Sequence, residues 1–442
     1  MNRNSTPALL AGLLLAGTAA AQLATRPDGY YASGVTNTGL VAGYTGADGY
    51  LLWNPDEGTT EDIGGVTPGD GAGGQAKFSL DGQRLSGGAT ATDGQEIAGY
   101  DRNAGAWTTY GSLGTSLDGS ASSGWAISAD GQTVVGLAWA GGFAAHAVAH
   151  SAAEGLMDLG SLVADRSTRA NAVSSDGGIV VGWQDSDGPW KSAVWRKNPA
   201  GGYFPNEYLL IDPNGSATDD NNQLGECNAI SADGHWIGGH GDYANNDEPW
   251  IWSEGTGAIN LGTMPGMGRG YVAAMSANGA IVVGWFDGMF FGDPRKAFMW
   301  TATDGIQDLN EYASTVLGVT LGTKGLYTAG DISPNGRYIC GWGLDSGDFS
   351  RFGFRLDMGT QTGIAASRAE AIAVYPNPAT DIIRFNSPEK AELTLSGADG
   401  KVVYRAQVAG EVGTDISGLA AGVYLLELRT ANGVRTQRIA KN

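Results

Sequence analysis

The sequence predicts an all-β protein with two parts, a large repeat domain and a small C-terminal domain. Glycine is the first indication, because 72 of the 442 residues are glycine, more than twice the usual share of about 7%. Tight turns between short strands favour this residue. The second indication is the phrase "ISADGQTVVGLAW" at 127–139, which recurs along the chain. Recurrence at a period of this kind is typical of propellers and related repeat folds.

Seven copies of this phrase occur within the first 358 residues, and each copy contains one turn glycine. The turn glycines are Gly39, Gly82, Gly131, Gly177, Gly234, Gly279 and Gly336. They lie 43 to 57 residues apart, which is too long for one hairpin. A third hydrophobic run ends in tryptophan in several repeats, as at Trp53 and Trp300, and a fourth run ends in a phrase such as "LMDLG". Four short strands per repeat predict a seven-bladed β-propeller over residues 22–358.

The Ser-x-Asp-Gly part of the phrase has two interpretations, a catalytic group or a turn. The Asp-Gly pair lies between two β runs, where a hairpin turn favours these residues. The serine hydroxyl can bond to nearby backbone and hold such a turn. Seven copies of a catalytic serine would serve no purpose, whereas seven blades need seven turns. We therefore interpret Ser128 and Asp130 as architecture.

The last repeat lacks a fourth run. A propeller commonly completes its last blade with a strand from the other end of the chain, which leaves no open sheet edge. Residues 22–28, "QLATRPD", are predicted to provide this strand. Three repeats also replace the third-run tryptophan, with Tyr100, His150 and Arg355.

The repeats resemble the HAF family of extracellular repeats. The resemblance rests on "KAFMWTATDGIQDLN" from Lys296 and "AVSSDGGIVVGW" from Ala172. It covers about residues 28–358, implies a β-propeller and says almost nothing about a ligand. "SPNGRYIC" from Ser333 is also similar to the repeats of TolB-type propellers.

Both ends of the chain carry targeting features. Residues 1–21 have a polar lead with Arg3, a short apolar run and small residues before Gln22, which predicts a cleaved secretory signal peptide. Residues 359–372 are small and polar and are predicted to be a linker. After them, alternating runs in 373–442 predict a small immunoglobulin-like β-sandwich.

The C-terminal part resembles the type A sorting domain of the type IX (Por) secretion system of Bacteroidetes. "VYPNPATDIIRF" from Val374 and "GLAAGVYLLELRTANGVRTQRIAKN" from Gly418 carry the resemblance. Its motif residues are Tyr375, Pro376, Asn377, Pro378, Thr380 and Asp381. The resemblance implies that the secretion machinery is a partner and that the protein is secreted to the outer-membrane surface or the extracellular medium.

The net charge of −20 argues against a nucleic-acid partner and an anionic membrane surface. Outside the signal peptide no apolar run reaches about 18 residues, so no transmembrane segment is predicted. Neutral sugars, cations and basic partners fit this charge better.

The loops between the second and third runs are the most variable part of the repeats. In a propeller these loops emerge on one face, and here they combine aromatic and acidic residues that suit sugar rings or a protein partner. The predicted ligand-binding residues are Asp185, Asp187, Trp190, Asp242, Tyr243, Asp247, Asp287, Phe290, Phe291, Asp345 and Phe349. The alternative is that the acids are ordinary turn residues and each aromatic packs locally.

No catalytic residue and no metal site are predicted. His146 and His150 lie about 13 Å apart along one predicted strand, too far for a shared metal, and all four histidines are interpreted as packing residues. Residues 212–226 resemble a calcium loop but lack the required glycine and terminal acid, so calcium stays a minor alternative and no cofactor is expected.

The cysteines, Cys227 and Cys340, fall in repeats that are not neighbours, so they are predicted not to form a disulfide. The function that the sequence favours is binding of a glycan or protein ligand without catalysis. The alternatives are a polysaccharide-degrading hydrolase or lyase on the same scaffold and a structural component of the cell envelope.

Overall fold

The chain divides into two compact units, residues 1–360 and 361–442. The computed structural model describes residues 22–46, 49–66, 74–92, 94–114, 122–141, 144–186, 190–206, 210, 224–241, 248–290, 292–359, 374, 379–397, 401–430 and 433–441. The predicted signal peptide lies outside the described residues. The division between the units falls within the predicted linker, whose boundaries stay a prediction.

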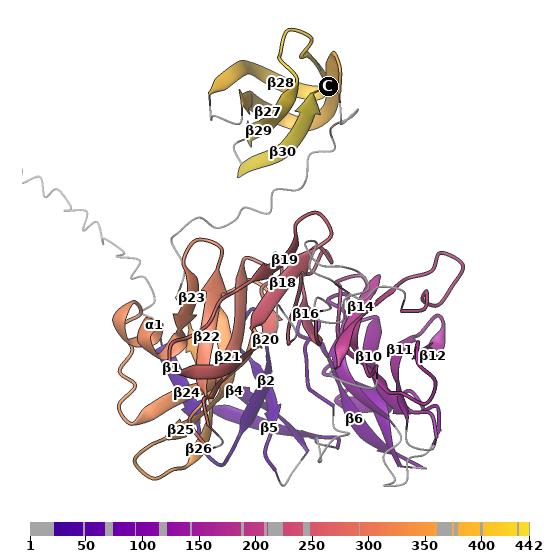
Figure 1. Cartoon of the computed structure of the whole chain (residues 1–442), viewed down its shortest axis with the longest axis vertical. Helices are drawn as coiled ribbons and strands as arrows, with labels where there is room; N and C mark the ends of the chain where they lie inside the picture. Colours follow the sequence, from indigo (N-terminus) through magenta and orange to yellow (C-terminus); the bar gives the residue numbers. More distant parts are fainter. Residues whose placement is uncertain are drawn as a thin grey trace, which may run out of the picture. The chain divides into compact units, whose positions relative to one another are not determined.

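The described strands of the first unit form seven antiparallel sheets, numbered 1 to 7 in chain order (Figure 1). Sheet 1 contains β2 (Tyr31–Val35), β3 (Val41–Tyr44), β4 (Tyr50–Asn54) and β5 (Thr59–Gly64). Sheet 2 contains β6 (Arg84–Ala91), β7 (Gly94–Asp101) and β8 (Ala106–Thr109). Sheet 3 contains β9 (Ser122–Ile127), β10 (Thr133–Trp139), β11 (Ala145–Ser151) and β12 (Gly155–Gly160). Sheet 4 contains β13 (Thr168–Val173), β14 (Ile179–Gln184) and β15 (Lys191–Arg196).

The remaining sheets follow the same order. Sheet 5 contains β16 (Cys227–Ile230), β17 (Ile237–His240), β18 (Pro249–Ser253) and β19 (Gly257–Asn260). Sheet 6 contains β20 (Met267–Met275), β21 (Ile281–Gly288), β22 (Lys296–Thr301) and β23 (Gly305–Asp308), and α1 (Leu309–Thr315) follows it. Sheet 7 contains β24 (Lys324–Ile332), β25 (Tyr338–Asp345), β26 (Arg351–Asp357) and β1 (Gln22–Arg26). In sheet 2 an isolated bridge of Phe78 with Leu85 takes the place of the first strand, and in sheet 4 a bridge of Lys197 with Tyr203 takes the place of the fourth.

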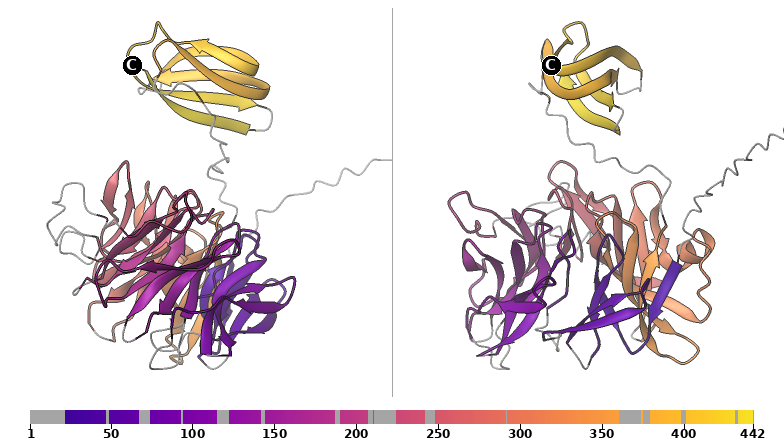
Figure 2. Two further views of the ribbon diagram at one scale, coloured as in Figure 1. Left: turned by 90° about the vertical axis from the view of Figure 1, so that its right-hand side faces the viewer. Right: turned by 180° about the vertical axis from the view of Figure 1, so that it is seen from behind.

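Sheet 7 is completed by the N-terminal strand. β1 pairs with β26 in antiparallel register from Gln22 opposite Asp357 to Arg26 opposite Gly353. The indigo β1 accordingly lies beside the orange strands in both orientations (Figures 1 and 2). The prediction that residues 22–28 supply the missing strand is confirmed.

Each sheet packs against the next one through a separate hydrophobic cluster, and sheet 7 packs against sheet 1. The cluster between sheets 7 and 1 includes Trp53 and the fully buried Cys340. The cluster between sheets 4 and 5 includes Cys227, which is also fully buried. Both cysteines are free, and the two thiols lie in different inter-sheet cores, as the repeat assignment predicts.

The repeated serine motif holds the first turn of sheets 2 to 7. Ser128 Oγ donates to Asp130 Oδ1 at 2.5 Å and accepts a hydrogen bond from the Thr133 N–H at 2.9 Å. Sheets 2 and 4 to 7 repeat this arrangement with their own serine and Asp or Asn. The turns are also joined to one another, because the Asp130 N–H donates to the Ser175 carbonyl at 3.1 Å, and Ser175 in turn donates to Ala232. The motif is architecture, as predicted.

In six sheets a bulge of the first strand lies opposite the glycine of the second strand. The register of β13 shifts between Ala170 and Ala172, which leaves Asn171 as a bulge. A Cβ atom on Gly182 would lie 1.8 Å from the Arg169 carbonyl oxygen at this bulge. The equivalent distances at Gly43, Gly136, Gly239, Gly284 and Gly341 are 1.8 to 2.1 Å. Only glycine fits where the bulged first strand approaches its neighbour so closely.

The second unit contains one antiparallel sheet in the order β28-β27-β29-β30. Its strands are β27 (Ile382–Gly397), β28 (Val402–Asp415), β29 (Gly422–Thr430) and β30 (Gly433–Lys441). The runs "DIIRF" and "AELTLSG", predicted as two strands, are one long strand, because pairing with β28 resumes after a register shift between Ser387 and Ala391. Phe385 and Leu393 both enter the same core.

Of the six sorting-motif residues, only Thr380 and Asp381 lie within the described part of the chain. The Asp381 carbonyl accepts a hydrogen bond from the Ile416 N–H at 2.7 Å. Among the described residues, no helix is long and apolar enough to cross a membrane.

Candidate functional site

The strands alternate in direction, so each sheet has two distinct ends. The serine turns lie at one end. The connections from second to third strands lie at the other end, together with the connections from one sheet to the next. We call this second end the loop end. Among the predicted ligand-binding residues, Asp185, Trp190, Asp287, Phe290, Asp345 and Phe349 are described and lie there. The others, Asp187, Asp242, Tyr243, Asp247 and Phe291, lie outside the described residues.

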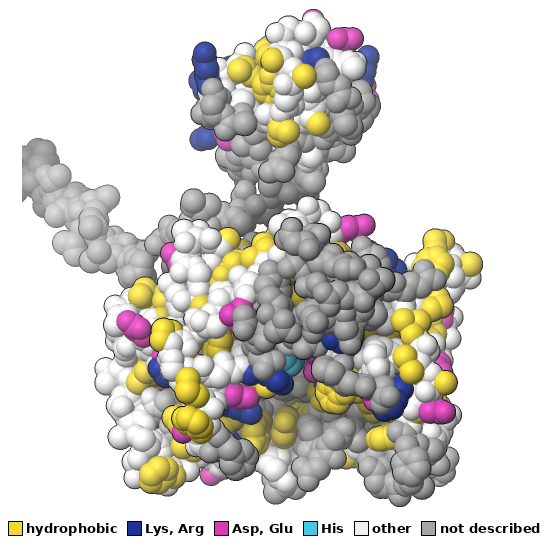
Figure 3. Space-filling view, viewed as in Figure 1, with side chains coloured by type: hydrophobic (Ala, Val, Ile, Leu, Met, Phe, Trp, Pro, Cys, Tyr) yellow, Lys and Arg dark blue, Asp and Glu magenta, His cyan; other side chains and the backbone are white. Residues whose placement is uncertain are grey.

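Exposed apolar side chains of the first unit gather at the loop end. Among its described residues the large exposed hydrophobic side chains there are Leu162, Val163, Trp190, Met289, Phe290, Val316 and Phe349. Among these described residues only Leu80, in a serine turn, and Phe204, beside the end of β15, lie elsewhere. Figure 3 shows yellow side chains interspersed with basic and acidic ones on one face of the unit. This one-sided distribution indicates an interaction surface.

Trp190 forms an aromatic platform on sheet 4. Its indole stacks on Trp183 with ring centroids 4.0 Å apart and an interplanar angle of 6°. Trp183 follows the second-strand glycine and is 5% exposed, whereas Trp190 is 46% exposed. Burial of Trp183 therefore fixes the orientation of a ring that is half open to solvent.

A polar cluster lies beside this platform on the first strands of sheets 3 to 5. The Arg169 guanidinium lies 3.9 Å from the Trp125 ring centroid and donates to Glu226 Oε1 at 2.9 Å. Asn171 Nδ2 also donates to Glu226, at 2.8 Å, and to the Cys227 carbonyl. Burial raises the pKa of the Glu226 carboxyl, and Arg169 opposes this rise. Trp125 and Asn171 are bulge residues, and bulges commonly redirect side chains near functional sites.

His240 extends the cluster toward sheet 6. Asn228, the bulge residue of β16, donates from Nδ2 to His240 Nδ1 at 2.9 Å, and the imidazole lies 4.3 Å from the Tyr271 ring. Burial, with smaller contributions from Arg269 and Arg169, lowers the pKa of His240 to about 3. The imidazole is therefore neutral at ordinary pH. The interpretation of His240 as a packing residue missed this hydrogen bond.

Arg169, Asn171 and Glu226 were not predicted as site residues. A signal was present, because "NAVSSDG" and "NAISADG" place an asparagine at the same position of neighbouring repeats. Of the acidic residues that were predicted, the three that the structure describes, Asp185, Asp287 and Asp345, are engaged in ion pairs. Asp287 Oδ1 lies 2.8 Å from Arg295 Nε, and Asp345 Oδ2 lies 3.1 Å from Lys324 Nζ.

A second aromatic cluster lies at the loop end where sheet 7 meets sheet 1. The Arg351 guanidinium lies 4.7 Å from the Tyr31 ring centroid and 4.8 Å from that of Trp342. Tyr31 stacks on Tyr44 at 5.3 Å. Phe349, two residues before Arg351, is 77% exposed and has a φ of +59°. A bulky residue rarely adopts this left-handed conformation.

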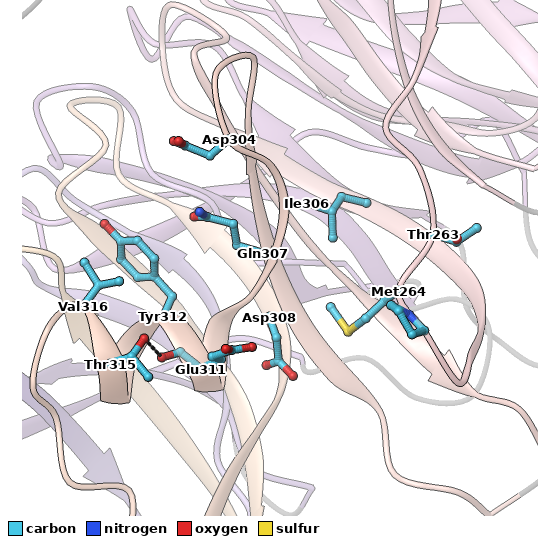
Figure 4. Close-up of a pocket in the computed structure, with 11 residues that line it drawn as sticks. Thr263, Met264, Asp304, Ile306, Gln307, Asp308, Glu311, Tyr312, Thr315 and Val316 are labelled. Atoms are coloured by element: carbon cyan, nitrogen blue, oxygen red, sulfur yellow. Dashed lines mark hydrogen bonds between the residues drawn. The ribbon is translucent and has the colours of Figure 1, made fainter.

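One cavity lies near α1, away from these clusters (Figure 4). It has a volume of about 440 Å³ and is lined by residues of the link before sheet 6, of β23 and of the helix. Its Asp308 caps α1 by accepting from the Asn310 N–H at 2.9 Å and pairs with Lys296 at 3.0 Å. Its acidic residues thus have structural roles. In the described part of the chain, no group of three His, Cys, Asp or Glu side chains could hold a metal ion.

The chain is similar to several solved structures at low sequence identity. TolB from Acinetobacter baumannii has a TM-score of 0.38 and 11% identity, covering 75% of this chain and 65% of that chain. Oligogalacturonate lyase from Vibrio parahaemolyticus has a TM-score of 0.41 and 12% identity, covering 76% and 91%. An oligogalacturonate lyase in complex with manganese has a TM-score of 0.45 and 12% identity, covering 76% and 96%. No curated protein matches the sequence significantly.

The family comparison concerns the second unit. Residues 373–442 match the family of secretion system C-terminal sorting domains. This segment is the one that the sequence resemblance identified. The protein is thus a type IX secretion substrate with a β-propeller-like fold, delivered to the cell surface or the extracellular space.

Proposed function

We propose that the first unit is a seven-bladed β-propeller that binds a glycan at its loop end and does not cleave it. The assignment of HAF-type repeats, a Bacteroidetes origin and an immunoglobulin-like sandwich for the second unit belong to the same proposal. Seven sheets in cyclic contact support the propeller.

The observation that carries the binding role is Trp190 stacked on the buried Trp183. An aromatic ring held in place by a second ring presents a flat apolar surface with little loss of side-chain freedom. Sugar rings have apolar faces and hydroxyl edges, so they fit a platform flanked by polar side chains. Asp185, two residues after Trp183 in the chain, pairs with Arg166 at 3.6 Å, which restricts the motion of its carboxylate.

A polysaccharide-degrading enzyme is the second candidate, and Glu226 is the observation that favours it. Its carboxyl is largely buried, and burial raises its pKa, as in the acid of a glycosidase. Against this role, the carboxyl already accepts hydrogen bonds from Arg169 and Asn171. Those bonds favour the ionised form and leave little capacity to give up a proton to a substrate.

The test is to incubate the full-length secreted protein with a panel of polysaccharides and to measure both retention and new reducing ends. Retention without new reducing ends supports the binding role, and release of reducing ends supports the enzyme. Trp190→Ala should lower retention about tenfold, because an aromatic contact of this kind contributes roughly 1 to 1.5 kcal/mol.

Phe204→Ala is the matched control. Phe204 is 44% exposed, like Trp190, but it follows the Lys197–Tyr203 bridge at the outer edge of the same sheet. Equal loss of retention in both variants would contradict a site at Trp190.

A further inference from the structure

Three sheets place an arginine against the tryptophan that follows the second-strand glycine. Arg169 lies 5.3 Å from the Trp183 ring, Arg295 lies 5.8 Å from Trp285, and Arg351 lies 4.8 Å from Trp342. The tryptophans occupy the same position in their repeats, whereas the arginines come from different parts of them: Arg169 lies in β13, Arg295 just before β22 and Arg351 in β26. The arginines also differ in whether a carboxylate pairs with them.

Arg169 and Arg295 are neutralised within the protein. Glu226 lies 2.9 Å from Arg169, and Asp287 lies 2.8 Å from Arg295. Arg351 has no such partner, since no carboxylate of the described residues forms an ion pair or hydrogen bond with its guanidinium. The neighbouring acids bond elsewhere. Hydrogen bonds from Thr323, Gly347 and Lys324 lower the pKa of Asp345 to about 2, and Asp348 accepts from the Ser350 N–H at 2.8 Å.

Arg351 is nevertheless held in place. Its guanidinium lies within 5 Å of both the Tyr31 and Trp342 rings, an arrangement that stabilises the cation and limits its side-chain motion. The side chain is exposed, so the N–H donors along its edge remain available. A fixed guanidinium binds a planar carboxylate with two parallel hydrogen bonds.

The aromatic surroundings indicate what the anion is attached to. Arg351 contacts the half-buried rings of Tyr31 and Trp342, which in turn pack against Tyr44 and Tyr327. Phe349 adds an exposed ring two residues away, in a strained backbone conformation that binding sites often retain. Rings of this kind stack on the faces of sugars, whereas an isolated carboxylate needs no apolar contact.

We infer that Arg351 is a recognition site for the carboxylate of an acidic sugar, with Tyr31 and Trp342 contacting the ring that bears it. The inference rests on the proposed glycan-binding function and specifies its ligand as a glycan that contains uronic acids. A sulfate ester on a neutral sugar would present similar acceptor oxygens, so the test must separate the two.

The experiment measures the affinity of the full-length protein for three oligosaccharides of equal length by calorimetry. The probes are a uronic acid oligomer, its neutral counterpart and a sulfated neutral oligomer. The uronic acid oligomer should bind at least about tenfold more tightly than the neutral one. Arg351→Gln should remove this difference and leave the affinity for the neutral oligomer unchanged. Arg196→Gln, an exposed arginine at the serine-turn end of sheet 4, should change neither.

The outcomes are distinguishable. Equal binding of the uronic and neutral oligomers, or an Arg351→Gln variant with unchanged preference, overturns this inference and leaves the proposed function standing. Tighter binding of the sulfated oligomer, or of poly-glutamate, also overturns the assignment to a uronic acid. Failure of all oligosaccharides to bind overturns the proposed function and the inference together.

Discussion

At the loop end, neighbouring residues decide whether a charged group is structural or free for a ligand. Arg169 is almost enclosed by Trp125, Asn171 and Glu226, so removal of its partner would leave an unpaired buried charge, which is costly. Arg351 is exposed to solvent, so its charge is stable without a carboxylate partner. An arginine that faces the equivalent tryptophan thus serves packing in sheet 4 and is proposed to serve recognition in sheet 7.

His240 should make the stability of the first unit depend on pH. Its folded-state pKa is about 3, whereas an unfolded histidine titrates near 6.5. Between these values only the unfolded chain binds the proton, so acidification lowers the free energy of unfolding by about 1.4 kcal/mol per pH unit. His240→Gln removes the titration and keeps a hydrogen-bonding side chain opposite Asn228.

The measurement is urea unfolding at pH 6.5 and pH 5. The wild-type protein should lose roughly 2 kcal/mol more than His240→Gln over this interval. His235→Gln, which changes an exposed turn histidine, is the control and should follow the wild type. The same pH dependence in wild type and His240→Gln would show that the imidazole is protonated in the folded state.

The backbone conformation of Phe349 should lower the free energy of unfolding of the wild-type protein. A left-handed φ costs about 1 to 2 kcal/mol for a residue with a Cβ atom, and the ring is 77% exposed, so little burial offsets this cost. Phe349→Gly should therefore raise the free energy of unfolding by about 1 kcal/mol while weakening ligand binding. Phe290→Gly is the control, because Phe290 is 72% exposed without a positive φ. Thermal unfolding of both variants is the measurement. A Phe349→Gly protein that is less stable than the wild type would contradict the prediction that the backbone at Phe349 is strained.

Among the secondary-structure elements, the bulged first strands supply side chains to the site, because Trp125, Asn171 and Asn228 of the polar cluster are bulge residues. Gly284 is the clearest position for a test, since its Cβ would lie 1.8 Å from the Tyr271 carbonyl oxygen and 2.9 Å from the Phe298 ring. Neither strand can move without breaking the core between sheets 5 and 6. Gly284→Ala should lower the free energy of unfolding by about 3 kcal/mol or more.

Gly255→Ala is the control for this variant, because nothing lies within 4 Å of the added Cβ and the φ is not positive. Chemical denaturation should find that variant within about 0.5 kcal/mol of the wild type. A Gly284→Ala protein of wild-type stability would mean that the bulge is not fixed by the fold.

The sequence predicted the elements that depend on local chemistry. The serine turns follow from Asp-Gly and Asn-Gly pairs, and the pairing of β1 follows from a repeat that lacks its outer run. The bulges were not predicted, because the first strands are short and rich in alanine and glycine, so the shift of the in–out alternation by one residue is not visible in their sequence. For that reason the positions of Asn171 and Asn228, and with them the polar cluster, were recognised only in the structure. The long strand β27 was missed for a related reason, since a register shift between Ser387 and Ala391 separates its two hydrophobic runs.

At the scale of the whole molecule, the two units have separate roles. Each has its own core, so a chain that ends at residue 360 should fold its repeat domain and yet fail to leave the periplasm. The measurement is cell fractionation of the truncated and full-length proteins, with circular dichroism and thermal unfolding of the truncated protein as the test of folding. Export of a folded, truncated protein at the wild-type level would contradict the sorting role of residues 373–442.

The pairing of β1 with β26 also constrains how the protein is made. Gln22 is synthesised near the beginning of the chain and Asp357 only after every other strand of the repeat domain, yet they are opposite each other in sheet 7. Contacts of such high sequence separation form late and slow the folding of β proteins. Until then β1 has no partner and both neighbouring edges are open to other chains. Completion of this one sheet is therefore the step that ends the interval in which the new protein is prone to aggregate.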